Sequence, residues 1–198
     1  MSTYLRVLGT EDMAEAPYTS SERLSRLTGF SAPQVCCDLA CFGHFGRRGV
    51  GYPVKVLQSE IRSILGIDRD WKVCVVGVGN LGNALMRYAG FEERGFKVVA
   101  AFDASPAKVG LTVGGVKIEP VAGLSRRVRE EGVQLAIISV PAEAAQEVLD
   151  QLVAGGVRAV LNFARRTLAA PEDVVISSVD LAVEIEYLSY ALAGRGVR

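Results

Sequence analysis

Residues 72–105 read KVCVVGVGNLGNALMRYAGFEERGFKVVAAFDAS, and this segment constrains the fold more than any other part of the chain. A hydrophobic strand leads into a glycine-patterned turn, a helix follows, and a second hydrophobic strand ends on an acid. This order is typical of a βαβ unit that binds a mononucleotide half of a dinucleotide. The sequence therefore predicts an α/β domain built on a parallel sheet.

The spacing of the glycines gives each position in the turn a separate task. Gly77 permits the tight turn, Gly79 lets the backbone approach a pyrophosphate, and Gly82 lets the helix pack closely on the strand. Asn80 and Leu81 open the helix, and its N-terminal dipole favours phosphate. These five residues are the expected pyrophosphate contacts.

The acid of the unit indicates which dinucleotide is bound. Asp103 lies 21 residues past Gly82, at the end of the second strand. A carboxylate there would accept hydrogen bonds from both hydroxyls of the adenine ribose and would repel a 2′-phosphate. The sequence therefore favours NAD(H) over NADP(H).

Two further buried strands, 134–141 and 158–163, flank a helix over 142–153. In open α/β sheets, ligands bind at the carboxyl ends of the strands. The expected neighbours of a nicotinamide are therefore the residues at these two strand ends, Val140, Pro141 and Asn162.

The chain divides near residue 70 into parts with different patterns. Residues 1–70 hold short helical patterns and a glycine-rich segment, and residues 71–179 hold alternating strands and helices. Residues 180–198 contain a helix that is apolar on more than one side. Such a helix needs a partner, so we expect it to pack against another subunit, with a core helix of a monomer as the alternative.

Composition excludes several classes of protein. A chain of 198 residues with 49% hydrophobic residues can form one or two domains with ample cores. No apolar run is long enough to span a bilayer, and the N-terminus lacks a secretory pattern, so a cytoplasmic protein is expected. The formal net charge is zero and neither half is basic, which gives no general electrostatic argument for nucleic acid.

The N-terminal part nevertheless contains a helix-turn-helix pattern. One helix can run from a cap at Thr19 or Ser20 to Leu27, and a second from a cap at Ser31 to Phe42. A last helix of this part covers residues 54–65.

The segment GHFGRRGVGYPV between these helices is typical of a β-hairpin wing. Arginines at its tip could enter a narrow A·T-rich minor groove, although two solvated surface arginines are the simpler alternative. The candidate DNA contacts of this part are Gln34, Arg47, Arg48 and Tyr52.

The order of these parts resembles the Rex family of bacterial redox-sensing transcriptional repressors, which respond to the NADH to NAD ratio. The similarity covers almost the whole chain and rests on the segments DLACFGHFGRRGVGY, VVGVGNLGNAL, AFDASPAKVG, SVPAEAAQEV, GVRAVLNFA and VDLAVEIEYLSYAL. It implies a winged-helix domain joined to a Rossmann-type NAD(H)-binding domain, in a homodimer that exchanges C-terminal helices. It also implies a double-stranded operator, an A·T-rich palindrome, that is released when NADH binds.

The resemblance further implies a switch made of three side chains. Tyr88 matches the family's sensor tyrosine, Asp180 the aspartate on the exchanged helix, and Arg6 a basic residue that competes for that aspartate. One carboxylate offered a phenol in one state and a guanidinium in the other would give two discrete arrangements.

The recognition helix departs from the family pattern. Family members usually carry basic residues before the Asp-Leu pair, whereas this chain has Cys36 and Cys37 before Asp38. Each lost phosphate contact weakens DNA binding. Two hypotheses stay open: a repressor that binds operator DNA, and an NAD(H)-binding regulator that has lost DNA binding and acts through a protein partner.

Other chemistry is less well supported by the sequence. Cys37, Cys41 and His44 share a face only if the helix passes Gly43, so no metal site is predicted, and thiol redox sensing is the alternative. An enzyme is not expected, because the only histidine lies in the N-terminal part, away from the nucleotide.

Overall fold

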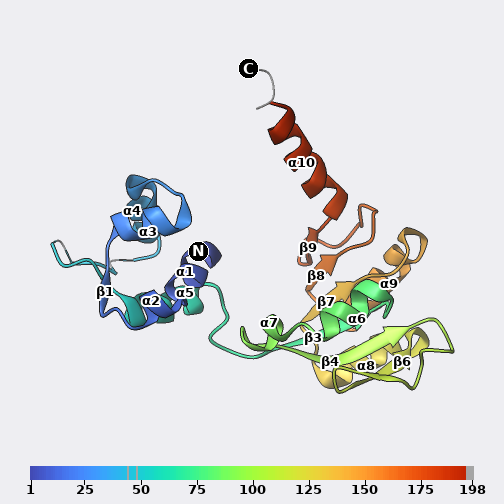
Figure 1. The fold of residues 1–198 in the computed structure, drawn as a ribbon. Helices are drawn as coiled ribbons and strands as arrows, with labels where there is room; N and C mark the ends of the chain where they lie inside the picture. Colours follow the sequence, from blue (N-terminus) through green and yellow to red (C-terminus); the bar gives the residue numbers. More distant parts are fainter. Residues whose placement is uncertain (44, 48, 195–198) are drawn as a thin grey trace. The chain divides into compact units, whose positions relative to one another are not determined.

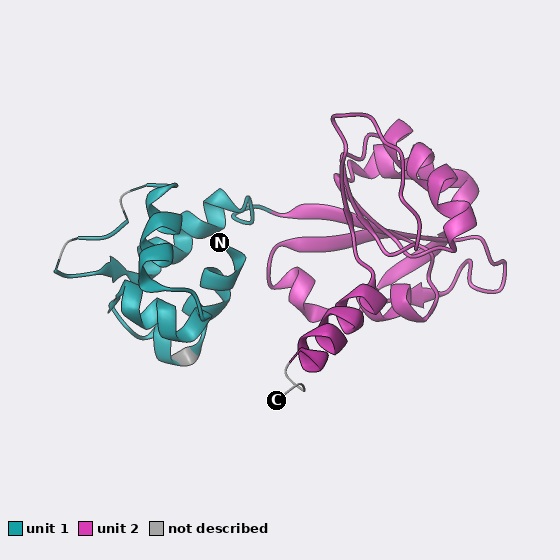
Figure 2. Cartoon of the chain, turned by 90° about the horizontal axis from the view of Figure 1, so that it is seen from above, with its two compact units in different colours: residues 1–69 teal, residues 70–198 magenta. Residues whose placement is uncertain are grey.

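The computed structural model describes residues 1–43, 45–47 and 49–194. The chain divides into two compact units, Met1–Arg69 and Asp70–Arg198, coloured separately in Figure 2. Each unit packs its helices and strands around hydrophobic side chains of its own.

The first unit is a small helical domain with one short antiparallel strand pair, which joins β1 to β2. Its elements in chain order are α1 (Ser2–Leu8), α2 (Glu11–Ala14), β1 (Tyr18–Thr19), α3 (Ser21–Thr28), α4 (Ala32–Ala40), β2 (Tyr52–Pro53) and α5 (Val54–Ile64). This is a winged-helix arrangement in which the wing lies between α4 and β2, and its described residues are 43, 45–47 and 49–51.

Local hydrogen bonds explain where α3 and α4 begin and end. The Ser20 hydroxyl accepts from the backbone N–H of Arg23 at 3.2 Å and caps α3, which ends at the left-handed Gly29. Ser31 caps α4. The predicted extension of α4 to Phe42 is not observed, because the Phe42 N–H bonds to the carbonyl three residues back and tightens the last turn.

The second unit is a seven-stranded sheet with the order β5-β6-β4-β3-β7-β8-β9, in which all neighbours are parallel except β5 and β6. The chain builds one side of the sheet from β3 outward and then returns to build the other side from β7. Its strands are β3 (Trp71–Val76), β4 (Phe96–Asp103), β5 (Thr112–Val113), β6 (Val116–Pro120), β7 (Leu135–Ile138), β8 (Ala159–Asn162) and β9 (Val175–Ser178).

The helices of this unit pack unevenly on the two faces of the sheet. They are α6 (Asn80–Met86), α7 (Ala89–Glu92), α8 (Leu124–Glu131), α9 (Ala142–Ala154) and α10 (Leu181–Ala193), with a 3-10 turn at Val121–Gly123. Helices α8 and α9 cover one face along its whole core, whereas α6 and α7 pack on the other face over β3 and β4.

The last helix has no covering partner within the described residues. It extends from the end of β9 in Figure 1, and none of its residues is buried. None of the helices in the described ranges combines the length and the apolar character needed to cross a membrane.

Candidate functional site

The turn between β3 and α6 is held so tightly that two of its glycines have no space for a side chain. Gly77 has φ +93°, and a Cβ there would lie 2.6 Å from the Ser139 carbonyl oxygen. A Cβ on Gly82 would lie 2.0 Å from the Gly77 carbonyl oxygen. The Ser139 hydroxyl donates to that same oxygen at 2.8 Å and fixes the turn against the end of β7.

Gly79 differs from its two neighbours, because no atom lies within 4 Å of the position its Cβ would take. It lines a cavity of about 500 Å³, within the range of small-molecule sites. The cavity wall combines polar side chains with an apolar floor and is formed by Val78, Gly79, Asn80, Asn83, Ala84, Lys108, Leu111, Val113 and Ile118. Packing explains Gly77 and Gly82, and the open space at Gly79 points to a bound group.

Asp103 lies at the end of β4 beside the same turn, with its carboxylate in several hydrogen bonds. It accepts from the backbone N–H of Val78 at 2.8 Å and from that of Ser105 at 2.8 Å, and Lys108 Nζ lies 3.1 Å from Oδ2. Burial acts to raise the pKa of Asp103, but the bonds from Ser105, Lys108 and Val78 outweigh it and lower the pKa. The carboxylate is therefore ionised at neutral pH.

This lowered pKa predicts an acid-sensitive contribution to stability. The folded-state pKa of Asp103 lies below its unfolded value, so its stabilisation is complete above the unfolded pKa of about 3.9 and is lost as pH falls through the folded pKa. We expect Asp103→Asn to lower the free energy of unfolding at pH 7, with a difference from wild type that shrinks below about pH 4. Urea unfolding measures this, with the exposed Glu143→Gln as the control. A difference independent of pH would contradict the assignment.

The predicted nicotinamide neighbours lie at the carboxyl ends of β7 and β8, on the same edge of the sheet. A methyl group of Val140 is 2.8 Å from the Cβ position of Gly77, so this residue contacts the turn directly. Pro141 precedes α9 as its N-cap residue and is exposed.

Asn162 is fully buried, and its amide is occupied by the loop that follows β8. Its Nδ2 donates to the carbonyls of Ala164 and Arg166 at 3.2 and 3.1 Å, and its Oδ1 accepts from the Ala164 N–H at 3.0 Å. This side chain shapes the loop beside the expected nicotinamide position.

The residues present fit a dinucleotide in this site. The turn leaves open space at Gly79, an ionised carboxylate stands at the neighbouring strand end, and the order of strands reverses between β3 and β7. Crevices at such reversal points are the usual dinucleotide sites of open α/β sheets.

In the first unit, helix α4 presents an uncharged outer face. Val35 and Leu39 are buried, whereas Cys36, Cys37 and Cys41 are exposed. This outer face therefore offers thiols to solvent.

The inner flank of α4 is fixed by Asp38. The Tyr4 hydroxyl donates to its Oδ2 at 2.6 Å, and Gln34 Nε2 donates to its Oδ1 at 2.5 Å. These two bonds lower the pKa of Asp38, and burial together with Asp38 raises the pKa of Tyr4. Gln34, a predicted DNA contact, is thus already bonded along its own helix.

The wing closes through paired backbone hydrogen bonds between Arg47 and Gly51, both 2.9 Å long. Arg47 is exposed, and within the described residues its side chain makes no ion pair. The Tyr52 hydroxyl donates to Cys36 Sγ at 3.9 Å, and burial, followed by this bond, raises the pKa of Tyr52 to about 12. Arg48 lies outside the described residues.

The three predicted switch residues belong to three different helices or helix starts. Arg6 is in the last turn of α1, in the first unit. Tyr88 precedes α7, is 56% exposed, and packs edge-to-face on Phe91 with ring centroids 5.2 Å apart. Asp180 caps α10 by accepting from the Ala182 N–H at 2.9 Å. In the described part of the chain, Tyr88 and Asp180 share no hydrogen bond.

Two residues of this site were not singled out from the sequence. Ser139 holds the glycine turn, and Lys108 pairs with Asp103. The only local signal for Ser139 is that a serine directly follows a buried strand. The only local signal for Lys108 is that a lysine lies five residues past the acid. His44 lies outside the described residues, among which no group of three or more metal-ligating side chains occurs.

Comparison with known proteins places this architecture in one family. Residues 68–166 match the family model described as CoA binding domain. A protein of Desulfitobacterium hafniense, named redox-sensing transcriptional repressor Rex, is 46% identical over 98% of this chain and 93% of its own length. The protein of that name from Thermus thermophilus is 45% identical over 96% of this chain and 89% of its own.

Solved structures match nearly the whole chain. The crystal structure of RSP in complex with β-NAD⁺ and operator DNA has a TM-score of 0.89 and 33% identity, and covers 97% of this chain and 87% of that one. RSP in complex with β-NADH gives a TM-score of 0.85, at 32% identity over 97% of this chain and 88% of that one. By sequence and by fold, the chain belongs to the Rex family of redox-sensing transcriptional repressors.

Proposed function

We propose that this protein is a transcriptional repressor that binds operator DNA through its first unit and releases it when its second unit binds NADH. The observation that carries the proposal is the dinucleotide cradle, with open space at Gly79 beside the ionised Asp103, in a chain that also holds a winged helix. The likeness to RSP, solved with β-NAD⁺ and operator DNA, supports the same function.

In this proposal each residue of the cradle has a defined task. Gly77, Gly79, Asn80, Leu81 and Gly82 form the backbone surface that receives the pyrophosphate. Asp103 accepts a hydrogen bond from the adenine ribose, for which its Oδ1 has a free lone pair besides the bond from Ser105. When bound, the dinucleotide supplies the redox signal, since its nicotinamide is cationic when oxidised and neutral when reduced.

The nicotinamide end of the site is formed by the loops after β7 and β8. Val140 and Pro141 line it, and Asn162 acts as a positioning residue, because its amide is used to hold the following loop. We expect no catalysis, since the proposal assigns no group that moves a proton during hydride transfer.

A homodimer that exchanges C-terminal helices is part of the proposal. Seven large apolar side chains of α10 are more than half exposed, namely Leu181, Val183, Ile185, Tyr187, Leu188, Tyr190 and Leu192. The face of the sheet that α6 and α7 leave open over β7–β9 holds an apolar cavity of about 290 Å³, lined by Leu135, Ile137, Leu161 and Val175 among others. A second copy's α10 would cover this face, and residues 180–198 thus act as a dimerisation segment separate from 71–179.

The switch of Tyr88, Asp180 and Arg6 belongs to the same assembly. Tyr88 is exposed at the start of α7, and Asp180 is the N-cap residue of α10. At either position a small rotation of the side chain would change its partner. An Asp180 carboxylate offered to Tyr88 in one state and to Arg6 in the other would give the assembly two discrete arrangements. We place the protein in the cytoplasm, where a repressor meets chromosomal DNA.

A specific observation favours the alternative function. The outer face of α4 carries thiols where phosphate contacts are expected, so the protein could bind NAD(H) and act through a protein partner without binding DNA. Fluorescence anisotropy of a labelled A·T-rich palindrome separates the two. Sequence-specific binding that NADH alone reverses supports the repressor, whereas weak, sequence-blind binding beside tight NADH binding supports the alternative.

The wing provides a quantitative test of DNA binding. Arg47→Ala should weaken operator binding and reduce the slope of log K against log salt by about 0.9, as expected for one lost phosphate contact. Arg126→Ala, which removes an 82% exposed arginine from the second unit, is the charge-matched control. An unchanged salt slope in Arg47→Ala would place the wing away from the phosphates.

A further inference from the structure

We propose that Cys36 is a second redox input: it forms a reversible mixed disulfide with an amino-acid or peptide thiol held in the cavity between α4 and the wing, and this adduct blocks operator binding. The consequence for DNA rests on the proposed function. The site of modification rests on the structure of the first unit alone.

The cysteines differ sharply in accessibility. Cys36, Cys37 and Cys41 are free and exposed. Cys74, in the central strand β3, is fully buried, and burial raises the pKa of its thiol to about 12. Thiol exchange requires access and a thiolate, so only the three exposed cysteines can react in the folded protein.

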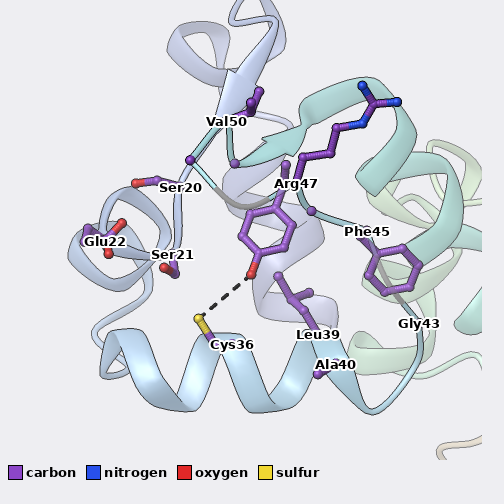
Figure 3. Close-up of a pocket in the computed structure, with 14 residues that line it drawn as sticks. Ser20, Ser21, Glu22, Cys36, Leu39, Ala40, Gly43, Phe45, Arg47 and Val50 are labelled. Carbon is purple, nitrogen blue, oxygen red and sulfur yellow. Dashed lines mark hydrogen bonds between the residues drawn. The ribbon is translucent and has the colours of Figure 1, made fainter.

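A cavity distinguishes Cys36 from the other two exposed thiols. It measures about 670 Å³ and is formed by the start of α3, one flank of α4 and the wing. Cys36 and Ala40 line it, whereas Cys37 and Cys41 do not. The Tyr52 hydroxyl donates to Cys36 Sγ, the bond drawn as a dashed line in Figure 3, and orients the sulfur toward the cavity.

The charges around the cavity match a zwitterion. Glu22 and Arg47 lie on opposite sides of it in Figure 3, with the Arg47 guanidinium turned outward, and the exposed Arg47 side chain can rotate toward a bound carboxylate. Hydrogen bonds from its own backbone N–H and from Ser20 lower the pKa of Glu22, so the carboxylate is ionised. An amino-acid or peptide thiol carries an ammonium and a carboxylate, which can face Glu22 and Arg47 while its sulfur reaches Cys36.

The reaction is a thiol–disulfide exchange with a low-molecular-weight disulfide as the oxidant. The Cys36 thiolate attacks one sulfur of that disulfide, a new S–S bond forms, and the old S–S bond breaks. The departing thiolate takes a proton from water, so Cys36 is oxidised and one half of the disulfide is reduced. Excess free thiol reverses the exchange.

Mass spectrometry of the full-length protein treated with oxidised glutathione tests the site. We expect the adduct on Cys36 to form about tenfold faster than on Cys37 or Cys41, equivalent to about 1.4 kcal/mol, and Cys74 to stay unmodified. An uncharged disulfide, 2-hydroxyethyl disulfide, should show a smaller preference. Glu22→Gln should slow the reaction at Cys36 but not at Cys37. Equal rates at the three exposed thiols with both disulfides would overturn the site.

Operator binding tests the consequence separately. Oxidised glutathione should weaken operator binding of the parent and of Cys37→Ser, and free thiol should restore it, whereas binding by Cys36→Ser should not respond. A glutathionylated parent that binds the operator as tightly as the reduced protein would overturn the regulatory role. If the reduced protein itself binds no operator, the repressor function fails, and the mass spectra still decide the assignment of Cys36.

Discussion

Gly79→Ala is expected to weaken NADH binding by about tenfold or more, which is at least about 1.4 kcal/mol, while the protein keeps its thermal stability. The added methyl group meets no atom within 4 Å, and the backbone at Gly79 has φ −77° and ψ −163°, which an alanine adopts without strain. The methyl group would project into the open space of the cavity and keep the pyrophosphate from the backbone. Titration calorimetry with NADH and thermal unfolding measure the two effects.

Gly82→Ala is the matched control for this prediction. Its Cβ would lie 2.0 Å from the Gly77 carbonyl oxygen, so the helix and the turn must move apart. Overpacking of this kind costs about 1–3 kcal/mol, and we expect a lower melting temperature together with weaker binding. Wild-type NADH affinity in Gly79→Ala would show that the pyrophosphate lies elsewhere.

The second large effect concerns the assembly. The intact protein should have a mass twice the 21.1 kDa of one chain, and Ile185→Glu combined with Leu188→Glu should convert it to a monomer. Both side chains are more than half exposed on α10, and burying one such side chain contributes about 1.5–3 kcal/mol, which a buried unpaired carboxylate would reverse. Light scattering over a range of protein concentrations measures the mass.

Ser189→Glu combined with Ala193→Glu adds the same charge to the same helix and is the control. On a helical wheel these two positions flank the Leu181, Ile185, Leu188 and Leu192 stripe, about 70° and 110° from its middle, so this variant should remain a dimer. A monomeric parent, or a dimer that survives the Ile185 and Leu188 substitutions, would refute the exchange of α10.

The β3–α6–β4 unit is predictable from sequence because its signals are local. Continuous apolar runs mark the strands, and each glycine of the turn has a distinct steric reason that spacing alone reveals. The β5–β6 hairpin also has a local signal in the sequence. Gly114 and Gly115, with φ +55° and +81°, form the two-residue turn that joins the short strand β5 to β6.

Other features depend on contacts between distant parts of the chain. Helix α8 is mostly charged, and only Leu124 and Val128 mark its buried side, which is a weak pattern. The role of Asn162 was unpredictable for a similar reason. A polar residue at a strand end suggests a ligand contact, but its buried amide is taken by the loop after β8, whose path follows from tertiary packing.

The buried position of Cys74 makes it a chemical probe of opening in the second unit. In a variant with serine at the three exposed cysteines, a thiol reagent can label the protein only when β3 is transiently uncovered. When closing is faster than labelling, the labelling rate follows the population of the open form. A ligand that binds only the closed form lowers this population by the factor 1 + [L]/Kd. The labelling rate of this one sulfur atom would therefore give the occupancy of the nucleotide site by NADH or NAD⁺, without a fluorescent label or DNA.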